Sequence, residues 1–69
     1  MATVNQIIGE HDVVELRDSA GRWRAGTRGT VVSDYGKVKL VEIADERGVA
    51  LDFLQVSEVE LSLLTRHGH

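Results

Sequence analysis

The chain has 69 residues, contains no cysteine and carries a formal net charge of −3. A chain of this length forms one domain, and the lack of cysteine excludes disulfides and thiolate metal sites. No apolar run approaches the roughly 20 residues of a membrane span. The first residues show no recognisable signal peptide, so we expect a cytoplasmic protein without membrane association.

Charge is divided unevenly along the chain. Residues 17–39 hold six basic and two acidic side chains, whereas residues 42–60 hold six acidic side chains and one basic. The two segments therefore carry net charges of +4 and −5, which predicts surfaces of opposite sign. A strong nucleic-acid binder usually has a net positive charge, whereas the net charge of this chain is −3.

Apolar residues alternate over five short segments. Val14 and Leu16 share one side of the first segment, and Val49, Leu51 and Phe53 share one side of the fourth. Because β-branched residues are frequent and turn residues separate the segments, we expect an all-β chain that forms an antiparallel sheet or small barrel. The expected strands are 12–16, 30–35, 37–43, 49–56 and 60–64.

Turn residues connect the central segments. Asp34 and Gly36 predict a tight hairpin after the second strand, and Asp45 and Gly48 predict another after the third. Glycine supplies the positive φ that such turns require, and aspartate accepts hydrogen bonds from the turn backbone. Both pairs therefore favour antiparallel neighbours.

The longest connection, residues 17–29, contains Gly26 and Gly29. These glycines precede a strand and not a helix, so they do not fit a nucleotide-binding loop. We expect them to relieve steric strain where the loop turns into the second strand. Near the other end of the chain, Ser57 and Glu60 fit a capping box, which predicts one helical turn before the last strand.

Four stretches, "VVEL", "AGTRGTVV", "VKLVEIADERG" and "LSLL", together resemble a bacterial family of uncharacterised small proteins catalogued as domain of unknown function 4926. Ile43 stands where that family has an aromatic residue. The resemblance implies a five-stranded SH3-like barrel over residues 12–64, with residues 1–11 as an N-terminal extension and residues 65–69 as a flexible tail. Similar glycine blocks occur in KOW-type barrels and in the nitrile hydratase β subunit, so they indicate fold more than function.

Trp23, the only tryptophan, lies in the long loop. One interpretation is a plug over the open end of the barrel, and the other is an anchor for a partner, because tryptophan and arginine dominate interface hot spots. Arg22, Arg24 and Arg28 surround it and would suit either a protein or RNA. Together with Tyr35 these residues form the candidate partner-binding set.

Three further charged residues lie in the third strand segment. Lys37 and Lys39 share one strand face, and we interpret them as solvated edge-strand lysines that discourage aggregation. Glu42 interrupts an apolar run, so we expect it to be buried and paired with an arginine of the long loop.

No catalytic constellation can be assembled from the sequence. The serines lack a histidine at a recognisable spacing, and His67 and His69 on a terminal segment make a weak metal site without carboxylate support. We therefore expect no enzyme activity, no cofactor and no metal.

Three functions remain. The first is a non-catalytic module that docks a protein partner, with an antitoxin or immunity-type role in which the acidic segment neutralises a basic protein. The second is an RNA- or ribosome-associated KOW-like barrel, and the third is an accessory barrel packed on a larger enzyme. Self-association into a homodimer is a further alternative, because an open sheet leaves strand edges.

Overall fold

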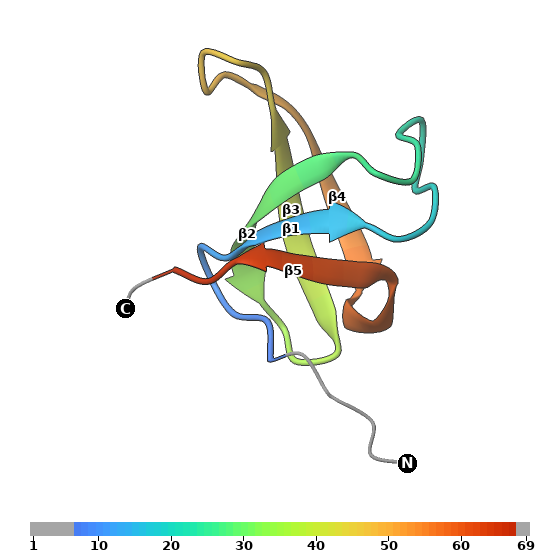
Figure 1. The fold of residues 1–69 in the computed structure, drawn as a ribbon, viewed down its shortest axis with the longest axis vertical. Coiled ribbons are helices and arrows are strands. Elements are labelled where there is room, and N and C mark those ends of the chain that lie inside the picture. The colour runs from blue at the N-terminus through green and yellow to red at the C-terminus, as the bar shows by residue number, and fades with distance from the viewer. Residues whose placement is uncertain (1–6, 68–69) are drawn as a thin grey trace.

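The computed structural model describes residues 7–67, which form one open antiparallel sheet (Figure 1). The expected all-β chain, with five strands and a helical turn before the last, is confirmed, although every boundary except the end of the first strand shifts by one or two residues. The elements are β1 (Val13–Leu16), β2 (Arg28–Asp34), β3 (Val38–Ala44), β4 (Ala50–Ser57), a 3₁₀ turn η1 (Glu58–Glu60) and β5 (Leu61–Thr65).

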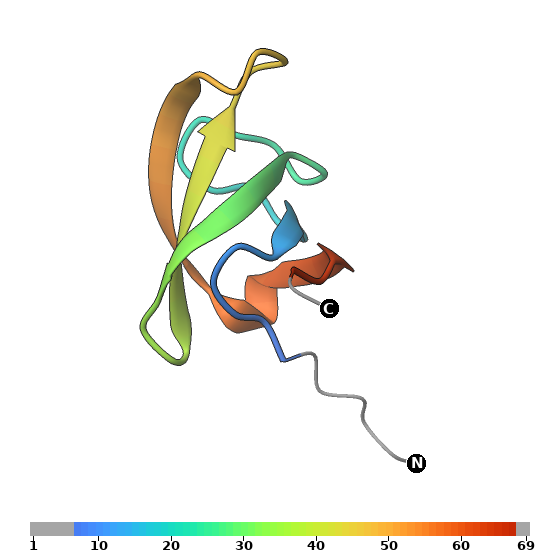
Figure 2. The same cartoon turned by 90° about the vertical axis from the view of Figure 1, so that its left-hand side faces the viewer.

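The strand order in the sheet is β4-β3-β2-β1-β5, so β4 and β5 are the two edges. Figures 1 and 2 show that the sheet curls, with β1 and β5 lying across β3 and β4 while β2 runs between the two groups. Apolar side chains of both groups meet between them. The buried core consists of Ile8, Val14, Leu16, Val31, Val41, Ile43, Val56 and Leu61.

β2 has two features that fit a strand at a bend in a sheet. Its pairing with β3 shifts register between Val31 and Ser33, and a bulge of this kind increases local twist. Gly29 lies inside β2, not at the loop bend where the sequence placed it. A Cβ there would lie 2.5 Å from Val41 Cγ1 and 2.8 Å from the Glu42 carbonyl oxygen, so β3 leaves no room for a side chain.

The two predicted hairpin turns have the expected geometry. Gly36 and Gly48 adopt φ of 88° and 84°, the region that glycine enters without strain. The Gly36 amide donates to Asp34 Oδ1 at 2.8 Å, and the Arg47 and Val49 amides each donate to Asp45 Oδ1 at 2.9 Å. Aspartate therefore closes both turns through its side chain.

The capping-box prediction is wrong. Ser57 is the N-cap of η1, but its side chain makes no capping hydrogen bond. The ends of η1 are tied instead to other parts of the backbone: the Glu58 amide donates to the Lys37 carbonyl, and the Arg17 amide donates to the Glu60 carbonyl, both at 2.8 Å. The first bond satisfies an amide at the start of η1 and the second a carbonyl at its end, so both ends are held without the serine hydroxyl.

Candidate functional site

The long β1–β2 loop is fastened to the sheet. Ala20 and Trp23 form an isolated antiparallel bridge, exchanging two backbone hydrogen bonds of 2.9 Å. The Gly26 amide donates to the Leu16 carbonyl at 2.8 Å, and the Leu16 amide donates to the Thr27 carbonyl at 2.8 Å. The loop is therefore ordered by its own backbone, and the bridge directs Trp23 toward the core.

Trp23 is half-buried and packs against the core cluster. Its Nε1 donates to Asp52 Oδ2 on β4 at 2.8 Å, and the Arg22 guanidinium lies 4.8 Å from the ring centroid. The indole thus has its apolar face against the core, its polar atom satisfied and a cation stacked on it. This arrangement favours the plug interpretation, because the indole N–H and the ring of Trp23 already have partners within the chain.

Asp52 connects this loop to the edge of the sheet. One carboxylate oxygen accepts the bond from Trp23, and the other accepts the Phe53 amide at 2.8 Å. The Trp23 bond, the Phe53 amide and the nearby charge of Arg22 hold the pKa of Asp52 below its usual 3.8. The carboxylate therefore stays ionised at neutral pH and joins the loop to β4.

The five candidate partner-binding residues do not form one surface. Arg22 and Arg24 are exposed in the loop, and Arg28 is exposed at the start of β2. All three therefore lie near the end of β2 that is joined to the loop and Trp23. Tyr35 is 61% exposed but directly follows the opposite end of β2, in the turn to β3. That seven-residue strand spans about 20 Å. Tyr35 is therefore separated from the arginines and the tryptophan.

A second surface, which the sequence did not identify, lies along β4. Val49, just before β4, and Leu51 and Phe53 within it are 57%, 47% and 53% exposed. The pairing of β4 with β3 shifts register between Ile43 and Ala44 and leaves Leu51 without a partner residue, as in a β-bulge. We call these three residues the outer β4 face. On the neighbouring strand, half-buried Glu42 pairs in register with Phe53. The sequence predicted that the three residues share one face, but the bulge at Leu51 interrupts the alternation on which that prediction rested.

The backbone edge of β4 is also available. Within residues 7–67, β4 pairs only with β3, so its other side has no neighbouring strand. The Phe53 amide is bonded to the Asp52 side chain, which shows that it points away from β3. Amide directions alternate along a regular strand, so the amide of Gln55 points the same way. The bulge at Leu51 interrupts this alternation before Asp52.

The expectation for Glu42 is wrong. The residue is half-buried and not fully buried, because it lies on the same outward face as Phe53. Among residues 7–67 it has no arginine within ion-pair distance, and the only ion pairs there involve Lys39. Partial access to water removes the need for a buried partner.

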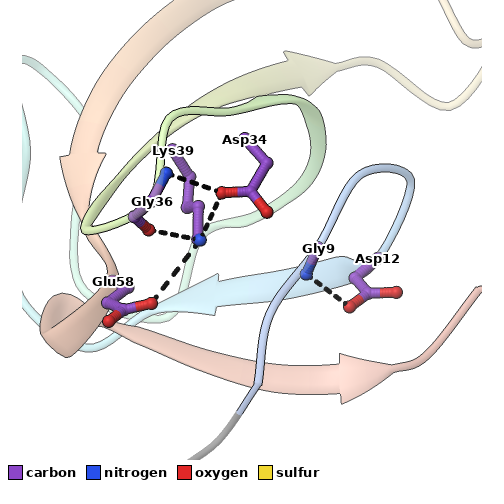
Figure 3. A network of polar contacts seen from close by, with 6 residues as sticks. All are labelled: Gly9, Asp12, Asp34, Gly36, Lys39 and Glu58. Carbon is purple, nitrogen blue, oxygen red and sulfur yellow. Dashed lines mark hydrogen bonds and ion pairs between the residues drawn. The ribbon is translucent and has the colours of Figure 1, made fainter.

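Lys39 is the buried cation of the described chain, and its interpretation as a solvated edge lysine is wrong. Only 3% of it is exposed, and β3 is an interior strand of the sheet. Its Nζ lies 2.6 Å from Asp34 Oδ1 and 3.5 Å from Glu58 Oε2, and it donates to the Gly36 carbonyl (Figure 3). Lys37, two residues earlier, is exposed as expected.

The Lys39 network joins the β2–β3 turn to η1. Burial lowers the pKa of the ammonium, but the hydrogen bond and charge of Asp34 and the charge of Glu58 outweigh it, so the pKa lies above 10.5. The bond from Lys39 also holds the pKa of Asp34 below 3.8. Each group therefore keeps its charge at neutral pH, and the buried ammonium is paired with carboxylates that reach the surface.

A second polar contact ties the two ends of the described chain together. Buried Asp12 accepts the Gly9 amide at 2.9 Å, as Figure 3 shows, and the His67 amide at 2.7 Å. The His11 and His67 rings meet edge to face at a centroid distance of 5.0 Å. His67, part of the segment expected to be a flexible tail, is thus bonded to the fold, whereas His69 lies outside the described residues.

Residues 7–67 were compared with the requirements of a metal centre and of a membrane-spanning helix, and they meet neither. No three histidine or acidic side chains within residues 7–67 are arranged to hold a metal ion. In the same part of the chain, no helix has the length and apolar character needed to cross a membrane. No family model, curated protein or solved structure matches this chain, so its function must be argued from its own residues.

Proposed function

We propose that this chain is a non-catalytic module that binds a protein partner through the outer β4 face. The observation that carries the proposal is the exposure of Val49, Leu51 and Phe53 beside a strand edge. Small domains rarely expose neighbouring large apolar side chains unless the surface binds something. Phenylalanine is also among the residues enriched at interface centres.

We also propose that the curled sheet is an SH3-like barrel, as the resemblance to the domain of unknown function 4926 implies. The strand order, the long β1–β2 loop and the 3₁₀ turn before β5 support this assignment. So does the position of β2, which pairs with β1 on one side and with β3 on the other. Residues 12–64 would form the barrel, with residues 1–11 and 65–69 flanking it.

The charge around β4 favours a basic partner. Residues 42–60, which contain the outer β4 face, carry a net charge of −5. Complementary charge accelerates encounter and disfavours wrong partners. An antitoxin or immunity-type role, in which the chain neutralises a basic protein, fits this surface better than a role on an acidic target.

Capture from the native cytoplasm with matched variants tests the proposal. The wild-type chain and Leu64→Ser, an exposed apolar position on the other edge strand, should retain one stoichiometric protein. Leu51→Ser combined with Phe53→Ser should lose it while keeping the circular dichroism of the wild type. Equal capture by all three chains would contradict the proposal. Capture of a large enzyme subunit would instead favour the accessory-barrel function.

RNA binding is the second candidate, because Arg22, Arg24 and Arg28 are exposed around the same loop. It predicts binding to single-stranded RNA that weakens steeply as salt is raised, since phosphate contacts release counterions. Arg24→Ser with Arg28→Ser should reduce that binding. Negligible binding at low salt would remove this candidate.

A further inference from the structure

We infer that Glu42 and Phe53 together form a binding site for an arginine side chain of the partner protein. The arginine guanidinium pairs with the Glu42 carboxylate and stacks on the Phe53 ring. This inference rests on the proposed function and deepens it by naming the residue through which the partner docks. Its support comes from the register of β3 and β4, the lack of an internal counterion for Glu42 and the charge of the surrounding chain.

Glu42 and Phe53 lie opposite each other on the outward side of the sheet. The pairing of β3 with β4 is regular over residues 38–43 and 52–57, and this pair falls within that stretch, beyond the bulge at Leu51. The residues on either side of Glu42 in β3 are buried, so Glu42 points away from the core. The Phe53 amide points away from β3, so the pair is of the non-hydrogen-bonded kind, in which opposed side chains are closest. A carboxylate and an aromatic ring therefore lie side by side on one accessible surface.

The Glu42 carboxylate has no cationic partner within residues 7–67. Arg28 lies on the same side of the sheet, since it alternates with Thr30, which pairs in register with Glu42. Arg28 itself lies opposite Glu15 of β1, and it forms no ion pair with Glu42. A half-buried carboxylate without a counterion is therefore open to a cation that another molecule supplies.

The chemistry of this pair fits a guanidinium better than an ammonium. A guanidinium is planar, forms two parallel hydrogen bonds to a carboxylate and stacks on aromatic rings. It is also more weakly hydrated than the ammonium of lysine, so it is less costly to place against an apolar ring. The chain already contains such a contact, since the Arg22 guanidinium lies 4.8 Å from the Trp23 ring centroid. An arginine side chain is therefore the occupant that matches both groups.

The surrounding charge favours a cationic occupant and disfavours an anionic one. Residues 42–60 carry a net charge of −5, and Arg47 is the only basic residue among them. Asp45 and Glu46 are exposed in the turn between β3 and β4. A nucleic acid would bring phosphates beside these carboxylates, and like charges across an interface are unfavourable. This surface therefore fits a basic protein and not RNA.

Short peptides with blocked termini test the inference. Three such peptides consist of glycine and serine and differ only at the central residue, which is arginine, lysine or citrulline. Citrulline has nearly the shape of arginine but lacks its charge. We expect the arginine peptide to shift the amide signals of Thr30, Glu42 and Phe53 in the ¹⁵N-labelled full chain. It should bind at least about threefold more tightly than the lysine peptide, and the citrulline peptide should not bind.

Variants of the full chain separate the two contributions. Glu42→Gln should weaken the arginine peptide about threefold or more, because it removes the charge and keeps the shape of the side chain. Phe53→Leu should also weaken it and should abolish the preference for arginine over lysine, because the ring is lost. Glu46→Gln is the matched control, since it removes a carboxylate from the neighbouring turn. At physiological salt, which screens distant charges, this control should leave the affinity unchanged.

Several results would overturn the inference. One is equal binding of the arginine peptide and either of the other two, and another is an equal loss of affinity with Glu42→Gln and Glu46→Gln. Tighter binding of free arginine than of the blocked peptide would indicate a small-molecule ligand instead. A dimer of the free chain that Glu42→Gln dissociates would mean that a second copy supplies the arginine. Non-additive effects of Arg28→Gln and Glu42→Gln on the free energy of unfolding would show that Glu42 is already paired.

Failure of this inference is distinguishable from failure of the proposed function. If capture of a protein depends on Leu51 and Phe53 while the arginine peptide does not bind and Glu42→Gln leaves capture unchanged, the proposed function stands and the occupant is wrong. If capture is unaffected by the Leu51 and Phe53 substitutions, the proposed function itself fails. Binding of the arginine peptide together with loss of capture in Glu42→Gln supports both.

Discussion

Trp23 and Asp52 join the longest loop of the chain to its exposed edge strand, through a 2.8 Å hydrogen bond from the indole Nε1 to the carboxylate. The same carboxylate accepts the Phe53 amide on the outer side of β4. Trp23, which the sequence left open as either a plug or a partner anchor, is therefore part of the support of another surface. The surface that it supports is the one with exposed apolar side chains.

This bond predicts non-additive losses of stability. Trp23→Phe keeps an aromatic ring at the site but removes the donor, and Asp52→Ala removes the acceptor. Each variant should lower the midpoint of thermal unfolding, and the double variant should lose less than the sum, because both changes remove the same bond. Circular dichroism measures the midpoints. Strictly additive losses would show that the bond does not contribute in solution.

Lys39→Met should lower the free energy of unfolding by about 1–3 kcal/mol, because charged hydrogen bonds are lost from a buried position. Lys37→Met, at an exposed position just before the same strand, should change it by less than about 0.5 kcal/mol. Urea denaturation measures both values. Equal effects of the two substitutions would contradict the role of the Lys39 network.

The Lys39 network also predicts how stability depends on alkaline pH. The folded pKa lies above the ordinary 10.5, so the contribution is fully present below 10.5 and is lost as pH rises through the folded value. The free energy of unfolding of the wild type should therefore fall as pH rises above 10.5. That of Lys39→Met should fall less over the same pH range. An alkaline profile that is identical in both chains would rule out this contribution.

Asp12 predicts loss of stability in acid. Burial raises the pKa of Asp12, but the hydrogen bonds from the His67 and Gly9 amides and the charge of Arg66 lower it by more. The net pKa therefore lies below 3.8. Its contribution is present above 3.8 and is lost as pH falls through the folded value. Asp12→Asn should flatten the acid limb of the unfolding curve, whereas Asp18→Asn, at an exposed loop position, should not.

Gly29→Ala should destabilise the chain by about 1–3 kcal/mol, because its methyl group would collide with the β3 backbone and the Val41 side chain. Gly9→Ala is the control, since a Cβ there has nothing within 4 Å and its φ is not in the left-handed region. We expect that control to stay within about 0.5 kcal/mol of wild type. Similar losses in both variants would contradict the close approach of β2 and β3.

Local patterns explain why the strands and turns were predictable from the sequence. Alternation places Val14 and Leu16 on one side, and both are buried. In the two turns, Asp34 and Asp45 accept backbone amides at most four positions away, so their turn-forming roles are visible in short stretches of sequence. Local chemistry was sufficient for these elements.

The errors concern contacts between segments far apart in sequence. Lys39 alternates with Val41 and therefore points to the core, but its partner Glu58 follows much later in the chain. Likewise, β4 has apolar residues on both faces, and only the position of Trp23 and its loop shows which face is covered. Alternation establishes which residues share a face, whereas tertiary packing decides which face meets water.

The most direct test of the central claim is amide exchange of the labelled chain, measured free and bound to the protein captured from the cytoplasm. The account predicts that binding slows exchange at Phe53 and Gln55, on the open side of β4, and leaves residues 17–27 unchanged. Slowed exchange confined to residues 17–27, with β4 unaffected, would contradict it.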